Sequence, residues 1–175
     1  GCRCGWQTSG AGGNVLADAL HPDEGSIPAE EVAYIALEPV QGEGGYRIPD
    51  EQFMADVEAI REQYDISIVC DEVQTGLGRT GEFWAVDHFE LTPDVIASAK
   101  GLRVGATIAR TDVFPDEKSR IASTWGGGDI LNSIVGAVTI DVIREQDLVA
   151  NATERGRQLR ETLSDAGLEA VTDIR

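Results

Sequence analysis

Two short apolar runs, each followed by a single ionisable residue, constrain the fold of this chain more than any other feature. The run ISIVC at residues 66–70 leads to Asp71, and the run VIASA at residues 95–99 leads to Lys100. Near-continuous apolar runs of this kind are typical of parallel strands whose two faces are both covered by helices. The carboxyl ends of such strands meet at one edge of the sheet, where open α/β sheets bind ligands. We therefore expect Asp71 and Lys100 to lie at the same edge.

Apolar spacing along the rest of the chain predicts an alternation of strands and helices. In residues 49–64, Phe53, Val57 and Ile60 recur at intervals of four and three, as on one face of a helix. A glycine-rich loop at residues 40–46 precedes this helix. Strands are expected at 32–37, 66–70, 93–99 and 103–110; helices are expected at 49–64, 130–144 and 148–166, with short ones within 15–20 and 82–91. This order predicts an α/β fold with a mostly parallel sheet.

The charge of the chain bears on its partners and its surroundings. Its 175 residues include 31 acidic and 14 basic ones, which give a formal net charge of −17. Such a surface repels nucleic acid and anionic membranes, so we expect neither partner, and no apolar run is long enough to predict a membrane span. Only Lys100 and Lys118 are lysines. Strong acidity with scarce lysine predicts a halophilic protein, the alternative being an ordinary acidic cytosolic one.

The cysteines bear on the compartment and on metal binding. Cys2, Cys4 and Cys70 form a sparse and odd set, which points to a reducing compartment and predicts a cytoplasmic protein. Cys70 falls in an expected strand and is interpreted as a small core residue. Structural zinc needs four ligands, and no second Cys/His cluster accompanies Cys2 and Cys4, so the sequence predicts no metal site.

The pairing of an acid with a lysine suggests one particular chemistry. A lysine at the end of a buried strand is costly unless it is paired, neutralised or covalently modified, and lysine forms Schiff bases with carbonyl compounds. Pyridoxal 5'-phosphate (PLP) needs a lysine on its aldehyde carbon and an acid near its ring nitrogen. Lys100 and Asp71 meet that requirement. The alternatives are a surface loop for Lys100 and a solvated turn for Asp71 and Glu72.

Four motifs in order resemble those of the class III, or ω-, aminotransferases. They are EPVQGEGGY at 38–46, DEVQTGLGRTGEFW at 71–84, PDVIASAKG at 93–101 and STWGGGD at 123–129. The family includes enzymes acting on 4-aminobutyrate, ornithine, acetylornithine and lysine. The resemblance implies a fold-type I PLP-transferase large domain, a three-layer αβα structure, here incomplete and with the start of a small domain. We accordingly divide the chain into a loop-rich segment at 1–30, a PLP-binding portion at 31–145 and a helix leading into the small domain at 146–175.

The resemblance implies roles for residues around the cofactor. Lys100 would be the catalytic residue, joined to PLP as a Schiff base and shuttling a proton during transfer of an amino group from an amino acid or amine to a 2-oxo acid. Asp71 would pair with the pyridinium nitrogen. Val73 would pack on the ring face, and Gln74 would hydrogen-bond the ring hydroxyl oxygen.

Three further roles follow from the same resemblance. Glu38 would support the region around the ring. Glu43 corresponds to the family's gate glutamate, which pairs with a substrate-binding arginine and releases it when a dicarboxylate binds. Thr124 would contact the phosphate of the cofactor held by the neighbouring subunit.

The chain also departs from the family pattern. Leu102-Arg103-Val104 replaces the usual glycine run after the lysine, and Gly128 stands where many members have asparagine. No phosphate loop or carboxylate-binding arginine of the small domain is recognisable, which indicates a fragment of a longer enzyme. Two alternatives to a transaminase stay open: a PLP-dependent racemase or aminomutase of the same fold, and an inactive remnant.

The helix expected at 130–144 predicts an oligomer. Its apolar residues are dense and wrap around more than one face, so we expect it to be well buried and covered on several sides. The cover could be the missing small domain. Together with the implied role of Thr124, this helix favours an obligate homodimer with two shared active sites.

Overall fold

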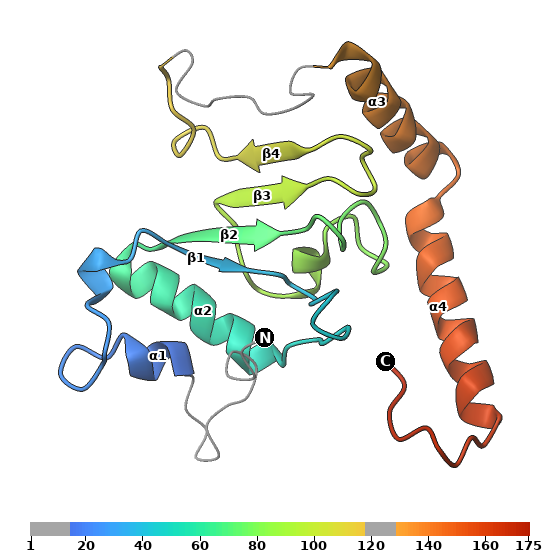
Figure 1. Cartoon of the computed structure of the whole chain (residues 1–175), viewed down its shortest axis with the longest axis horizontal. Helices are drawn as coiled ribbons and strands as arrows, with labels where there is room; N and C mark the ends of the chain where they lie inside the picture. Colours follow the sequence, from blue (N-terminus) through green and yellow to red (C-terminus); the bar gives the residue numbers. More distant parts are fainter. Residues whose placement is uncertain (1–14, 118–128) are drawn as a thin grey trace.

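A four-stranded sheet organises the computed structural model, which describes residues 15–117 and 129–175 (Figure 1). Its strands lie in the order in which they occur in the chain. The first three strands are parallel and the fourth is antiparallel to the third. They are β1 (Tyr34–Leu37), β2 (Ser67–Asp71), β3 (Val95–Ser98) and β4 (Ala106–Ala109). The predicted α/β class with a mostly parallel sheet is thus confirmed.

The helices expected from the sequence are present, together with one short helix at Ala29–Glu31 that was not expected. The main ones are α2 (Glu51–Tyr64), α3 (Ile130–Glu145) and α4 (Leu148–Asp165), and the short ones are α1 (Val15–Ala19), η1 (Ala29–Glu31) and η2 (Ala85–His88). None of the helices in the described part of the chain is both long and apolar enough to cross a membrane.

Helix α2 forms the core together with β2. Asp50 caps its first turn by accepting a hydrogen bond from the backbone N of Phe53 at 2.7 Å. At the other end Asp65 adopts a left-handed conformation with φ 55°. The predicted stripe of Phe53, Val57 and Ile60 is buried, and Met54 is buried beside it.

Burial alternates along the strands, which gives the sheet two unlike faces. Ile68 and Cys70 of β2 are buried in one cluster with residues of α2, whereas Val69 is half-buried and Asp71 exposed. On β1, Tyr34 and Ala36 are exposed on the same face as Val69. Of the three layers expected for the complete domain, the described residues therefore supply the sheet and one helical layer. The division into three segments stays a prediction.

A buried acid that the sequence did not single out joins three parts of the fold. Asp94 has 6% of its surface exposed. It accepts hydrogen bonds from the backbone N of Ile68 at 2.8 Å, from Arg61 Nε at 3.3 Å and from Arg110 Nη1 at 3.1 Å. One carboxylate thus connects β2, α2 and the residue that follows β4.

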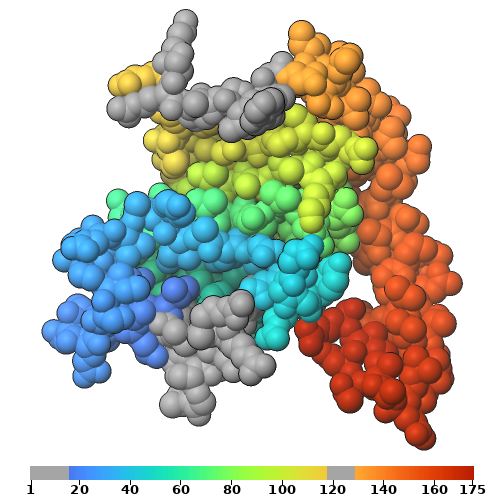
Figure 2. Space-filling model, viewed as in Figure 1, coloured from blue at the N-terminus to red at the C-terminus, as the bar shows by residue number. Residues whose placement is uncertain are grey.

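Helices α3 and α4 run along one side of the sheet (Figures 1 and 2). Helix α4 closely approaches the glycine turn that follows β2. Gly78 has φ +88°, and a Cβ added to it would lie 2.9 Å from Val149 Cγ2 of α4. Thr153 Oγ1 donates to the carbonyl of Gly81 at 3.4 Å. A glycine at position 78 therefore satisfies both the left-handed backbone and the approach of α4.

The prediction that α3 is well buried is wrong for this chain. Ile130 and Leu131 are 73% and 74% exposed, and Ile134 and Val138 are more than half exposed. The described residues of α3 that are buried are Gly136 and Ile143. Because α3 meets the rest of the chain along one narrow line, most of its apolar surface remains in solvent.

We expect Asp94→Ala to lower the free energy of unfolding of the full-length protein by about 2–3 kcal/mol. The substitution leaves the buried backbone N–H of Ile68 and the Nε of Arg61 without their acceptor. Urea unfolding curves measure the change. Asp112→Ala is the matched control, since Asp112 pairs with Arg110 at the surface. Equal shifts for both variants would contradict the role given to Asp94.

Candidate active site

The hydrogen bonds between β2 and β3 continue past the ends of both strands. The backbone N of Glu72 donates to the carbonyl of Ala97 at 2.8 Å, and the backbone N of Lys100 donates to the carbonyl of Val73 at 3.1 Å. These two bonds hold the segment after β2 against the segment after β3. The structure thus places Asp71 and Lys100 at the same edge of the sheet.

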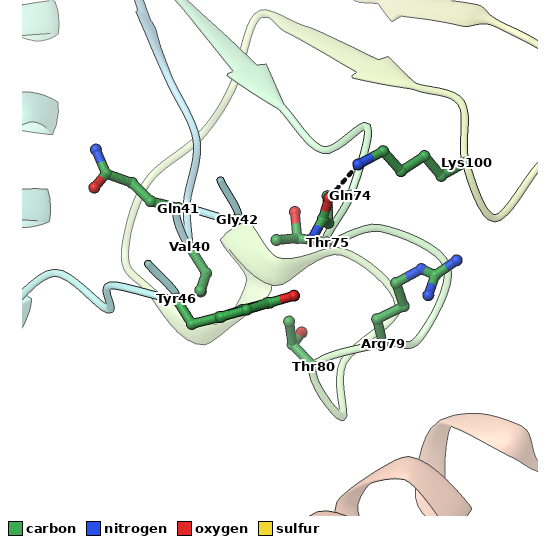
Figure 3. Close-up of a pocket in the computed structure, with 9 residues that line it drawn as sticks. All are labelled: Val40, Gln41, Gly42, Tyr46, Gln74, Thr75, Arg79, Thr80 and Lys100. Atoms are coloured by element: carbon green, nitrogen blue, oxygen red, sulfur yellow. Dashed lines mark hydrogen bonds between the residues drawn. The ribbon is translucent and has the colours of Figure 1, made fainter. Parts of the chain in front are cut away.

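Lys100 lies in a turn two residues beyond β3, and its side chain is exposed. Its Nζ donates a hydrogen bond to Gln74 Oε1 (Figure 3). Burial of the lysine, which motivated its choice from the sequence, is not observed in this chain. The structure does join the two motifs that carry Lys100 and Gln74.

Asp71 is exposed at the end of β2 and stabilises the turn that follows. Its Oδ1 accepts a hydrogen bond from the backbone N of Val73 at 3.0 Å. Both Asp71 and Lys100 are described, and no hydrogen bond or ion pair joins their side chains. Val73 is half-buried. Backbone pairing therefore places the acid and the lysine on adjacent segments, with the carboxylate of Asp71 open to solvent.

The loop after β1 completes the edge. Glu38 Oε2 accepts from the backbone N of Gly42 at 2.9 Å, which folds this loop back on itself. A Cβ on Gly42 would lie 2.8 Å from Gln74 Cδ. Glycine at position 42 therefore lets Gln74 approach the loop, and contacts run without a break from Glu38 through Gly42 and Gln74 to Lys100.

A cavity of about 420 Å³ opens between these loops (Figure 3). Gly42, Gln74 and Lys100 line it, and the ring of Tyr46 extends into it from the loop after β1. Arg79 borders it from the glycine turn. Tyr46 and Arg79 were missed from the sequence, although both belong to motifs singled out there.

One described residue expected at the site, Glu43, does not line the cavity. It lies at an exposed position of the loop after β1. Thr124 lies outside the described residues, and so do Cys2 and Cys4.

Glu72 stabilises the turn after β2 from the buried side, and it was not identified from the sequence as a site residue. Glu72 has no exposed surface. The alternative of a solvated turn at Asp71 and Glu72 therefore holds for Asp71, which is exposed, and is wrong for Glu72. Its carboxylate accepts from Thr75 Oγ1 at 2.5 Å and from the backbone N of Val86 at 2.8 Å. Strand alternation could have revealed it, since Glu72 follows Ile68 and Cys70 at intervals of two. Burial, helped by the charge of Glu72, raises the pKa of the Cys70 thiol to about 12, so Cys70 stays protonated in the core.

The comparison with protein families shows to which family this chain is related. The model of the class III aminotransferases matches residues 16–175. This chain belongs to that family. The class III aminotransferases are PLP-dependent, fold-type I enzymes, and the resemblance to them that the sequence indicated is confirmed.

Solved structures agree with this assignment. The chain is 32% identical to the ornithine aminotransferase of Plasmodium yoelii (TM-score 0.74), covering 81% of this chain and 40% of that one. It is 30% identical to the ornithine aminotransferase of Toxoplasma gondii (TM-score 0.77), covering 83% of this chain and 36% of that one, and in that protein PLP partly occupies the active site. A transaminase from the marine bacterium Virgibacillus is 28% identical (TM-score 0.83), covering 91% of this chain and 38% of that one. The chain spans about two fifths of the length of these relatives.

The residues at the edge fit PLP in kind. Lys100 presents an exposed amine to the cavity, where an aldehyde could reach it. Asp71 presents an exposed carboxylate on the adjacent segment, and Gln74 offers an amide that already contacts Lys100. An amine and an acid on neighbouring strand ends are the groups that this cofactor requires.

We expect Gly42→Ala to move Gln74 away from the loop after β1, because the new methyl group would overlap Gln74 Cδ. The Gln74 side chain can rotate, so stability should change little while the hydrogen bond to Lys100 is broken. A crystal structure of the variant checks this. Gly156→Ala, on exposed helix α4 with no atom within 4 Å of the added Cβ, is the control. An unmoved Gln74 in Gly42→Ala would contradict the packing described.

Proposed function

We propose that this chain is part of a PLP-dependent transaminase that moves an amino group from an amino acid or amine to a 2-oxo acid. The observation that carries the proposal is the joining of the two segments beyond β2 and β3, where Lys100 contacts Val73 through its backbone and Gln74 through its side chain. Membership of the class III family supports the same reaction.

PLP, when bound, supplies an aldehyde carbon and a ring that accepts electrons. Lys100 would hold the cofactor through its Nζ, and the same Nζ would carry a proton to and from Cα of the substrate. An exposed amine on a flexible stem suits both tasks, because the same nitrogen must reach two positions. Gln74 limits where Nζ can lie before the cofactor arrives.

The negative charge of Asp71 would keep the ring nitrogen of the cofactor protonated. The hydrogen bond that Asp71 accepts from the backbone N of Val73 orients the carboxylate without neutralising it. Val73 would pack on the ring, and Gln74 would contact the ring hydroxyl oxygen. Glu38 acts through Gly42, whose position sets that of Gln74.

The amino donor is proposed to carry an ω-amino group. Support comes from the two ornithine aminotransferases among the similar structures. Glu43 stands on an exposed loop close to Gly42 and is free to act as a gate toward an arginine of the complete enzyme.

The complete enzyme is proposed to be a homodimer. Helix α3 exposes Ile130, Leu131, Ile134 and Val138, an apolar surface that a second copy would cover. Thr124, which precedes α3 in the sequence, would reach the phosphate of the partner's cofactor. We further infer a cytoplasmic protein from its sparse and odd set of three cysteines. The net charge of −17 and the scarcity of lysine support adaptation to high salt.

We expect Lys100→Ala in the full-length enzyme to lower the transamination rate by about 10³-fold or more while leaving the fold intact. The sequence offers Lys118 as the one other lysine, so Lys118→Ala is the matched control and should keep its activity. Steady-state rates and circular dichroism measure the two effects. A Lys100→Ala variant with more than trace turnover would show that the lysine is misassigned.

We expect Asp71→Asn to retain cofactor yet lose most of its activity. The amide oxygen can still accept from the Val73 backbone, so the turn survives, but a neutral group cannot hold the ring nitrogen protonated. Cofactor absorbance and turnover are measured on the same sample. Near wild-type turnover would remove Asp71 from the site.

A further inference from the structure

The turn that carries Lys100 is held at its two ends by backbone hydrogen bonds. The backbone N of Lys100 donates to the carbonyl of Val73 at 3.1 Å, and the backbone N of Arg103 donates to the carbonyl of Ala99 at 2.9 Å, which closes the turn. The middle of the turn is left to side-chain packing. Because the side chain of Lys100 is long and exposed, the position of its Nζ depends on how firmly this turn is seated.

Leu77, in the glycine turn after β2, packs against the middle of the lysine turn. Leu77 is buried and has φ +62°, a left-handed conformation that costs a leucine free energy. A Cβ added to Gly101 would lie 3.1 Å from Leu77 Cδ1 and 3.2 Å from Leu77 Cβ. Glycine at position 101 therefore lets Leu77 rest on the backbone directly after Lys100.

Helix α3 contacts the same turn through Leu102. Gly136 is one of the two residues of α3 that are buried, the other being Ile143. A Cβ added to Gly136 would lie 3.1 Å from the carbonyl oxygen of Leu102, 3.3 Å from its Cδ1 and 3.4 Å from its Cγ. Leu102 is half-buried. Leu102 thus rests against the backbone of α3 at the one position in that stretch of helix that carries no side chain.

Gly136 has a packing reason that a second helical glycine does not share. A glycine inside a helix is unfavourable, because its backbone loses more freedom on folding than that of alanine. Gly136 lies within α3 and Gly156 within α4. No described atom lies within 4 Å of a Cβ added at Gly156, whereas Leu102 occupies that space at Gly136. The approach of Leu102 accounts for glycine at position 136.

We propose that Leu102 is a positioning residue for Lys100. By resting on α3 at Gly136, Leu102 holds the lysine turn so that Nζ of Lys100 stays in contact with Gln74 at the cavity. This inference rests on the proposed function, because it gives the seating of the turn a role in presenting the reactive amine. Since most of the apolar surface of α3 is exposed in this chain, the contact also ties the position of Lys100 to that of a helix with little other support.

The test compares acetylation of Lys100 and Lys118 by N-hydroxysuccinimidyl acetate in the full-length protein without cofactor, followed by mass spectrometry of the two peptides. We expect Leu102→Ala and Gly136→Ala each to raise the rate at Lys100 relative to Lys118 about threefold or more. A loosened turn releases Nζ from Gln74, and one hydrogen bond corresponds to about that factor.

Two control variants keep the contact intact. Leu102→Met preserves the volume of the side chain and should keep the wild-type ratio of the two rates. Gly156→Ala makes the same exchange as Gly136→Ala within a helix but meets no described atom, so it should leave the ratio unchanged.

The double variant Leu102→Ala/Gly136→Ala tests whether the two residues act through one contact. Substitutions that remove the same contact are not additive, so the double variant should react no faster at Lys100 than the faster single variant. A rate increase equal to the product of the two single increases would overturn the pairing.

Two further results would overturn the inference. The variants could unfold at lower urea concentration while the Lys100 rate stays unchanged, which would make the contact merely structural. Alternatively, both lysines could react faster by the same factor, which would show a general loosening of the fold. Because acetylation needs no cofactor, failure of the proposed function would appear separately, as a wild-type Lys100 that PLP and borohydride leave unlabelled.

Discussion

Parallel pairing of β2 with β3, carried on beyond both strands, is the constraint on which the rest of the site depends. Two backbone hydrogen bonds, from Glu72 to Ala97 and from Lys100 to Val73, align an acid-bearing turn with a lysine-bearing turn. Glu72 secures the first turn from inside, where its carboxylate binds Thr75 and the backbone of Val86. Removing a buried acceptor of this kind would leave those donors unsatisfied and release the turn from the core.

The unlike faces of the sheet explain why the site is open. One face packs on α2, which fixes the strand ends rigidly. The other face of the sheet and the apolar side of α3 are exposed in this chain, and a cavity lined by Arg79 and Arg103 is open. The chain spans about two fifths of the length of its relatives. A rigid edge bearing reactive groups next to uncovered surfaces is an arrangement that a second chain or a further domain can complete. The proposed dimer follows from these surfaces.

The elements could be read from the sequence because their signals are local. Apolar spacing predicted α2, and two β-branched runs predicted β2 and β3 with Asp71 and Lys100 at their ends. Long-range effects could not be read in the same way. Burial of Asp94 depends on Arg61 and Arg110, which lie 33 and 16 residues away. Exposure of α3 depends on which other segments pack against it, and the sequence of the helix alone predicted a buried helix. The approach of Gln74 to Gly42 depends on how two loops meet.

The central claim is that Lys100 is the residue that carries the cofactor, and chemical trapping tests it most directly. The full-length protein is incubated with PLP, treated with borohydride and digested, and the labelled peptide is identified by mass spectrometry. Borohydride fixes PLP to the nitrogen that holds it. We predict one labelled peptide, containing Lys100, and loss of that label in Lys100→Ala. A label on Lys118, or an unlabelled Lys100 peptide under conditions where the protein binds PLP, would contradict the account.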